Sequence, residues 1–98
     1  MIQHLVLFKW KPATTTADQA AACAALAALR DTIPGIIALT VGAQNSPEGK
    51  GKGFHTGLTV TFLDAAAREA YQSHPAHQQA VAGFRAHVED VIVLDYAY

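Results

Sequence analysis

The chain has 98 residues, of which 51% are hydrophobic and 15% charged, and its formal net charge is −1. This composition is typical of one globular domain and excludes the basic footprint of a nucleic-acid-binding protein. The apolar runs are too short for a membrane span and no signal peptide opens the chain, so we expect a cytoplasmic protein. The single cysteine, Cys23, allows no internal disulfide and no thiol-based metal cluster.

The N-terminal third predicts a strand followed by a helix. Residues 2–11 are apolar at both alternate sets of positions, which predicts a strand covered on both faces. Residues 14–33 predict an alanine-rich helix, in which Thr16 and Gln19 have the spacing of a capping box. Apolar side chains recur along this helix and form one line: Ala22, Leu26, Leu29 and Ile33.

A proline and a glycine then separate this helix from two strands joined by a loop. After Pro34 and Gly35, residues 36–43 predict a second strand. Residues 44–53 are rich in glycine, proline, asparagine and serine, which is the composition of a mobile loop. Residues 54–62 predict a third strand, because large apolar and small polar side chains alternate along them.

The C-terminal third predicts a broken helix followed by a strand. Asp64 is a suitable N-cap for a helix that ends near Ser73. Pro75 fixes φ and lacks an N–H, so it fits the first position of a second helix, which we expect to extend to about Glu89. Residues 91–96 predict the last strand.

The order of these elements predicts a ferredoxin-like α+β fold in a single domain, residues 1–98, with a four-stranded antiparallel sheet and its helices on one face. A chain of this size buries only roughly 60 to 65% of its unfolded surface, and helices on one face leave apolar residues bare on the other. We therefore expect a homodimer closed sheet against sheet. The expected interface residues are Leu5, Leu7, Leu58, Val60, Phe62, Ile92 and Leu94.

The segment around Pro75 carries the most informative chemistry of the chain. On an unbroken helix, Tyr71 and His77 would point in widely different directions at about 100° per residue, but the break lets them converge. His77 lies in the first turn of its helix, where the positive dipole end favours a neutral ring that can act as a base. The Tyr71 hydroxyl can then stabilise an enolate oxygen. The alternative is that the two side chains only hydrogen-bond each other across the helix break.

The other polar candidates do not converge on one point. His74 precedes Pro75 and either caps the new helix or faces a ligand or solvent. His4 and Asp95 lie at facing ends of neighbouring antiparallel strands and predict a pair, which either orients a ligand or satisfies a buried histidine. His55 lies nearer the opposite end of the sheet. We therefore expect no metal site and no cofactor, although a cation on main-chain oxygens near the end of the first helix is left open.

Several short motifs together resemble the stress-responsive A/B barrel (Dabb) family over nearly the whole chain. They are Ile2-x-His4-x-Val6-x-Phe8-Lys9, Ile33-Pro34-Gly35, Gly53-Phe54-His55, Tyr71-x-x-His74-Pro75-x-His77 and Asp95-Tyr96. The segment from Tyr71 to His77 is the most specific of them. The resemblance implies a dimeric α/β barrel. Family members include plant stress-associated proteins and a polyketide cyclase, olivetolic acid cyclase.

The resemblance to this cyclase implies a pocket between the sheet and the helices. Its tyrosine and second histidine of the shared segment do the chemistry, and their positions here are Tyr71 and His77. Around that pair we place the ligand-pocket residues His4, Val6, Phe8, Ala22, Cys23, Leu26, Leu39, His55, Gly57, His74 and Asp95. Bulky aromatics of the cyclase's first helix are replaced here by Ala22, Cys23 and Leu26, which implies a different substrate.

These features favour a dimer that binds a hydrophobic, carbonyl-bearing small molecule. If it is an enzyme, we expect a cofactor-independent cyclase, lyase or isomerase with His77 as base and Tyr71 as hydrogen-bond donor. The first alternative is a non-catalytic, stress-associated binding or structural dimer. The second is a monooxygenase or haem-degrading enzyme, since similar dimeric barrels include both, but no cofactor motif favours it.

Overall fold

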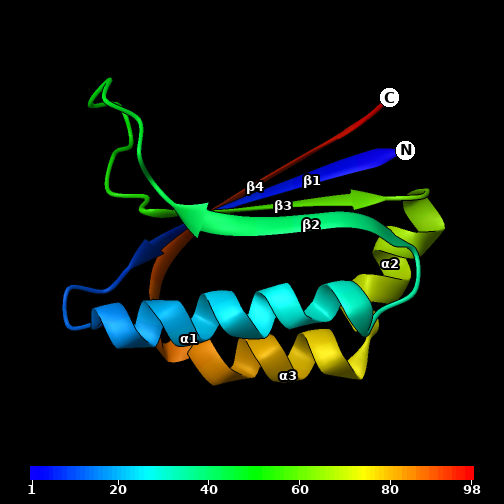
Figure 1. Cartoon of the computed structure of the whole chain (residues 1–98), viewed down its shortest axis with the longest axis horizontal. Coiled ribbons are helices and arrows are strands. Elements are labelled where there is room, and N and C mark those ends of the chain that lie inside the picture. The colour runs from blue at the N-terminus through cyan, green and yellow to red at the C-terminus, as the bar shows by residue number, and fades with distance from the viewer.

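The computed structural model describes residues 1–98 as two layers, an antiparallel four-stranded sheet and a layer of helices on one of its faces (Figure 1). The strands, in sheet order β2-β3-β1-β4, are β1 (Ile2–Trp10), β2 (Ile36–Ala43), β3 (Thr56–Phe62) and β4 (Val88–Ala97). The helices are α1 (Thr16–Ala27), α2 (Ala65–Ser73) and α3 (Pro75–Phe84), and the short 3₁₀ helices η1 (Ala28–Asp31) and η2 (Arg85–His87) follow α1 and α3. This is the ferredoxin-like α+β fold that the order of elements predicts. None of the helices qualifies as a membrane-spanning segment.

The start of α1 differs from the prediction by a small shift in its cap. The Thr15 hydroxyl accepts a hydrogen bond from the Asp18 N–H, and the Asp18 carboxylate accepts one from the Thr15 N–H, both at 3.0 Å. The capping box therefore lies one residue before the predicted pair of Thr16 and Gln19. A carboxylate accepts hydrogen bonds more strongly than an amide, which favours the register that places an acid at the third helical position.

The boundaries of β3 and β4 also differ from the prediction. β3 begins at Thr56 rather than at residue 54, and β4 begins at Val88 rather than at residue 91. The backbone of Phe84 leaves the helical region, with φ −123° and ψ −2°, so α3 does not extend to Glu89. Val88 instead pairs with Trp10 and extends the sheet.

The core lies between the sheet and the helices. Alternate residues of β1 and β3 point to the helical layer and pack against the predicted apolar line, in which all four residues are buried. The α-helix ends at Ala27, before the predicted residue 33, so Leu29 of this line lies in η1 and Ile33 lies in the turn after it. Leu58 lies opposite Val6 in the register and Val60 lies opposite His4, so they share this face, and with Phe62 they are almost inaccessible. The prediction that Leu58, Val60 and Phe62 form the dimer interface is therefore wrong. Alternation separates the two faces of a strand, but only the register shows which face the helices cover.

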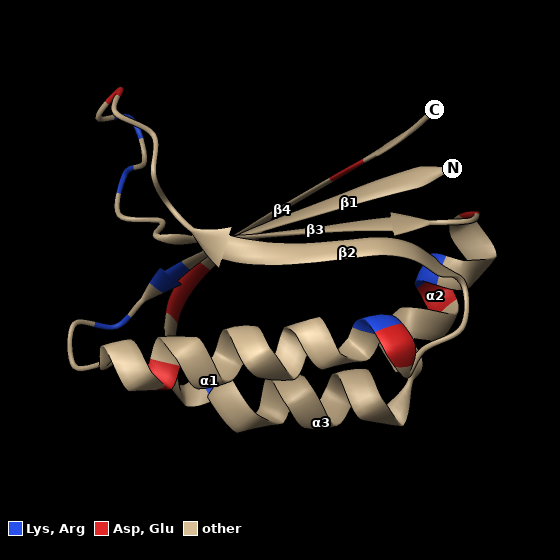
Figure 2. Cartoon of the chain, in the orientation of Figure 1, with Lys and Arg blue, Asp and Glu red and all other residues tan.

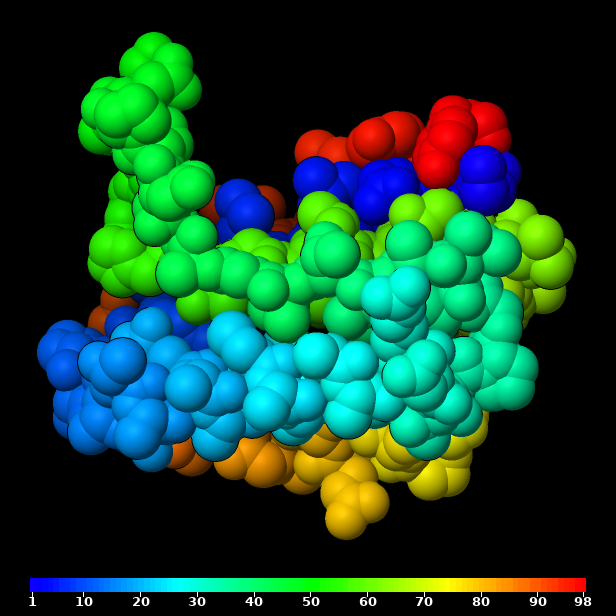
Figure 3. Space-filling view, in the orientation of Figure 1, coloured from blue at the N-terminus to red at the C-terminus, as the bar shows by residue number.

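The opposite face of the sheet is bare. Leu7, Ile92 and Leu94 are 40%, 45% and 57% exposed, and Leu5 is half-buried beside Leu94. Thr59 and Thr61 of β3 face the same side, since Thr59 pairs with Leu5. The loop between β2 and β3 rises from one end of the sheet on this side, away from the helices (Figures 1 and 3).

Gly35 allows α2 to pack closely against the start of β2. Its φ of +89° lies in the left-handed region, and a Cβ at this position would lie 2.7 Å from the Cβ of Ala67 on α2. The Gly35 carbonyl accepts a hydrogen bond from the N–H of Leu63, just before α2. This close contact fixes the helix that carries Tyr71 over the sheet.

Candidate active site

The predicted helix break is present, and His74 holds it. The backbone of His74 is extended, with φ −66° and ψ 134°, so α2 ends at Ser73 and α3 begins at Pro75. The His74 Nδ1 accepts a hydrogen bond of 3.0 Å from the N–H of Ala76. His74 is therefore the N-cap of α3, one of the two roles that the sequence left open, and it does not line the main cavity.

The break brings Tyr71 and His77 together. Their ring centroids lie 4.3 Å apart at an angle of 42°, and they contact each other without a hydrogen bond. The His77 Nδ1–H donates to the carbonyl of Gln72 at 3.2 Å. Tyr71 is 1% exposed and its hydroxyl has no partner within the chain. Every side-chain nitrogen or oxygen that is shielded from solvent has a hydrogen-bond partner in this structure. The Tyr71 hydroxyl has none, so it is open to the cavity that Tyr71 lines.

Burial shifts the pKa values of both groups in the direction that proton transfer needs. Burial lowers the pKa of His77, the nearby His4 lowers it further, and the Gln72 carbonyl opposes both effects. His77 is therefore a neutral ring near pH 7, whose Nε2 carries the free lone pair. Burial raises the pKa of Tyr71 to about 12, so its hydroxyl stays protonated and available as a donor.

A second imidazole lies near Tyr71 and is held by a carboxylate. The predicted pair is present, because the His4 Nδ1–H donates to Oδ1 of Asp95 at 2.6 Å. The other carboxylate oxygen accepts from Arg68 of α2 at 3.1 Å. The His4 and Tyr71 ring centroids are 6.2 Å apart. The sequence did not identify Arg68, which neutralises a carboxylate that is only one-fifth exposed.

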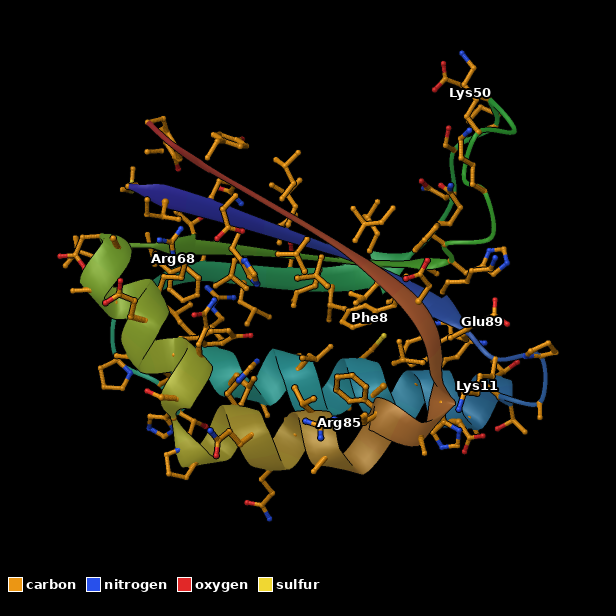
Figure 4. The ribbon with its side chains drawn as sticks, turned by 180° about the vertical axis from the view of Figure 1, so that it is seen from behind. Phe8, Lys11, Lys50, Arg68, Arg85 and Glu89 are labelled. Atoms are coloured by element: carbon orange, nitrogen blue, oxygen red, sulfur yellow. The ribbon has the colours of Figure 1, made fainter.

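These side chains lie at one end of a mostly apolar cavity of about 370 Å³. The cavity is bounded by β1 and β4 on the sheet side and by α3 and η2 on the helical side, the region seen in Figure 4 around Phe8 and Arg85. Its lining comprises His4, Val6, Phe8, Leu26, Leu58, Tyr71, Gln72, His77, Val81, Phe84, Arg85, Val88, Val91 and Val93. No helix covers β4, so Val91 and Val93 remain exposed at the edge where the cavity opens. This size is within the range of small-molecule sites.

Six residues that the sequence assigned to the site line the cavity: His4, Val6, Phe8, Leu26, Tyr71 and His77. The remaining assignments lie elsewhere. Ala22 and Leu39 are buried in the core, and Asp95 lies behind His4. Cys23 is half-buried on α1 and does not line the cavity, and burial raises the pKa of its thiol.

His55 and Gly57 are not part of this cavity, and their assignment to it is corrected. His55 is exposed in the segment that leads into β3. Gly57 pairs with Leu7, so it faces the open side of the sheet and lines a separate depression with Leu7 and residues of the β2–β3 loop. The alternation that places Thr56 and Leu58 under the helices necessarily turns Gly57 away from them.

The sequence reasoning missed several lining residues: Leu58, Gln72, Val81, Phe84, Arg85, Val88, Val91 and Val93. The sequence contains one pattern that indicates two of them, Val81 and Arg85. His77, Val81 and Arg85 are four residues apart, so they form one face of a helix that continues from the catalytic candidate. The contribution of β4 follows from its register beside β1, because the pair of His4 with Asp95 places Val93 opposite Val6 and Val91 opposite Phe8.

Comparison with known proteins assigns the family. The model of the stress-responsive A/B barrel domain, Dabb, matches residues 2–98. The chain belongs to the Dabb family. No curated protein matches its sequence. Many solved structures share the Dabb fold seen here.

Three of these structures indicate the range of similar proteins. A dimeric ferredoxin-like protein of unknown function from Jannaschia sp. CCS1 is 28% identical, with a TM-score of 0.86 over 99% of this chain and 98% of that one. At3g17210 from Arabidopsis thaliana is 24% identical, with a TM-score of 0.90 over 100% and 95%. Hydroxynitrile lyase from Passiflora edulis is 21% identical, with a TM-score of 0.87 over 97% and 90%. The last two show a shared fold alone.

Proposed function

We propose that this Dabb protein is a cofactor-independent enzyme that moves a proton on a hydrophobic, carbonyl-bearing small molecule. The observation that carries the proposal is the contact of Tyr71 with His77, at 4.3 Å between ring centroids, at the polar end of an apolar cavity. His77 is the base and Tyr71 is the hydrogen-bond donor. A neutral imidazole beside a protonated phenol is the pairing that proton abstraction next to a carbonyl requires.

The chemistry follows from the protonation states of the two groups. The Nε2 of His77 takes the proton from a carbon next to a carbonyl, and the electrons of the C–H bond move to the carbonyl oxygen to form an enolate. The Tyr71 O–H donates a hydrogen bond to that oxygen. The histidine then returns its proton to a carbon of the product. Alternatively, the enolate carbon attacks a second carbonyl of the same molecule and closes a ring, and the histidine gives its proton to the oxygen of that carbonyl. Neither outcome needs an oxidant or a metal.

His4 supports this arrangement by presenting a second imidazole to the cavity. Its Nδ1–H is committed to Asp95, which leaves the Nε2 edge of the ring for a bound molecule. The two imidazoles and the phenol therefore offer three polar contacts to a ligand.

We also propose that the protein is a homodimer closed through the bare face of the sheet. The exposed apolar side chains of Leu7, Ile92, Leu94 and Tyr96 support this, because a contiguous patch of this kind is unusual on a monomer. The similar Jannaschia protein is dimeric. The cavity lies on the other side of the sheet, so closure through this face leaves its lining unchanged.

Deuterium exchange tests the proposed chemistry without knowledge of the natural substrate. Ethyl 2-benzylacetoacetate is hydrophobic and has a single hydrogen between two carbonyls, whose NMR signal disappears as it exchanges in D₂O. We expect the protein to accelerate this loss over buffer, and His77→Gln to slow the catalysed rate roughly a hundredfold. Tyr71→Phe should slow it by about tenfold or more, because the oxyanion donor is lost.

The exposed residue His55 provides a matched control. His55→Gln should keep the wild-type rate, which excludes general catalysis by surface imidazoles. Equal rates for wild type and His77→Gln would contradict the assignment of the base. Binding of the ester without any acceleration would favour the non-catalytic binding protein instead.

A further inference from the structure

One face of α3 runs along the whole cavity. His77, Val81 and Arg85 are spaced by four residues and all line the cavity, and the N–H of Arg85, the C-cap of α3, donates to the carbonyl of Val81. Residues four apart on a helix lie on the same face. At a rise of 1.5 Å per residue, Arg85 follows His77 along this face by about 12 Å.

One face of β1 forms the facing wall and runs in the same direction. His4, Val6 and Phe8 all line the cavity, and at about 3.3 Å per residue they span roughly 13 Å. Ring contacts fix the alignment of the two walls: Tyr71, which contacts His77, lies beside His4, whereas Phe84, which precedes Arg85, contacts Phe8 at 5.7 Å. The cavity is therefore a slot with the imidazoles and Tyr71 at one end and Arg85 at the other.

Arg85 is the permanently charged residue of this lining, and it has no ionic partner. The ion pairs of the chain join Lys9 to Glu89 and both His4 and Arg68 to Asp95. α3 itself carries no acidic residue near Arg85 (Figure 2). The neighbouring lining residues are apolar, namely Phe84, Val88 and Val91. Figure 4 shows Arg85 on the helical side of the cavity, below Phe8.

We propose that Arg85 binds a carboxylate of the ligand at the end of the slot opposite His77. The ligand is then a hydrophobic oxo acid, with its reacting carbonyl beside Tyr71 and an apolar body of about 12 Å between the two ends. This inference deepens the proposed function and rests on its placement of the carbonyl. A guanidinium is suited to this role, because its planar donors match the two oxygens of a carboxylate.

The experiment compares a keto acid with its uncharged amide. Affinities of 9-oxodecanoate and 9-oxodecanamide are measured by calorimetry at pH 7.5 for wild type, Arg85→Gln, Arg85→Lys and Arg30→Gln. We expect wild type to bind the carboxylate about tenfold more tightly than the amide. Arg85→Gln should abolish this preference by weakening carboxylate binding alone, and Arg85→Lys should retain part of it. Arg30→Gln removes an exposed positive charge from η1, outside the cavity, and should keep the full preference.

Equal or undetectable binding of the two probes to wild type would overturn the proposal, as would a preference that survives Arg85→Gln. Tighter binding of nonyl phosphate than of the keto acid would reassign the site to a phosphate and reject the carboxylate. A different result would contradict the proposed function alone. If wild type prefers the carboxylate but does not accelerate deuterium exchange, Arg85 remains the anion site and His77 is not a base.

Discussion

At the scale of single residues, the two imidazoles of the site are oriented through the same ring nitrogen but by different partners. His77 donates its Nδ1–H to a backbone carbonyl, that of Gln72, whereas His4 donates its Nδ1–H to the side chain of Asp95. In both cases the Nε2 makes no hydrogen bond within the chain and is left for a ligand. The orientation of His77 is therefore tied to the helix break, while that of His4 depends on a side chain that a substitution can remove.

The lowered pKa of His77 predicts the acid limb of the activity profile. Burial disfavours the imidazolium, so the basic form persists to a pH below the ordinary histidine value of about 6.5. As pH falls, protonation removes the free lone pair, and the rate falls with it. The rate of deuterium exchange, measured from pH 4.5 to 8, should reach half its maximum below pH 6.5. A midpoint at or above that value would contradict the assignment of His77.

At the scale of elements, the site depends on a helix that stops and restarts. Asp64 caps α2 through the N–H of Ala67 at 2.8 Å, and His74 caps α3 through the N–H of Ala76 at 3.0 Å. Pro75 occupies the first position of α3, where its missing N–H leaves no donor unpaired. The cap of α3 thus sets the direction of the helix that carries His77.

Removal of this cap should destabilise the fold by a predictable amount. His74→Ala leaves the first turn of α3 without its side-chain acceptor, and the free energy of unfolding should fall by about 1 kcal/mol. His74→Asn supplies an amide oxygen in place of the ring nitrogen and should recover most of the loss. Urea denaturation of the three proteins measures this. Wild-type stability in His74→Ala would show that the cap contributes nothing.

The sequence predicted those parts of the fold and site that local patterns determine. Pro75 predicted the break and hence the approach of Tyr71 to His77, and the facing strand ends predicted the pair of His4 with Asp95. Arg68 was missed because its contact with Asp95 joins a helix to the edge strand, and no periodicity encodes that distance.

The wrong assignments also arise from contacts that local sequence patterns do not determine. Leu58 was assigned to the dimer face because a period of two separates the faces of β3 without showing which one the helices cover, and Gly57 was assigned to the cavity by the family resemblance alone. The register of β3 beside β1 decides this, and it depends on contacts between residues far apart in the chain. The helix and strand ends shifted by a few residues, where caps and turns compete with periodicity.

At the scale of the whole molecule, the helices leave one face of the sheet uncovered. The apolar side chains there are on β1 and β4, namely Leu5, Leu7, Ile92, Leu94 and Tyr96. Figure 2 shows few charged residues on the strands, so little on this face opposes contact with a second copy. The loop between β2 and β3 projects from the same side of the sheet as this apolar face (Figure 3).

A charge on this face should separate the proposed dimer. Leu94→Glu places a carboxylate among the apolar side chains of this face, and the light-scattering mass of the variant in solution should fall to that of a monomer, whereas wild type should have twice that mass. Val93→Glu is the matched control, because Val93 lies on the same strand, is also 57% exposed and faces the cavity side. It should remain dimeric. A monomeric wild type would refute the proposed interface.

The contact between His4 and Asp95 joins residues that are 91 positions apart. During synthesis, His4 therefore cannot pair with Asp95 until almost the entire chain has left the ribosome. Contacts of such long sequence separation slow folding, since a large loop must close before they form. The reactive end of the slot is thus among the last parts of the protein to be assembled, and a prematurely terminated chain lacks it.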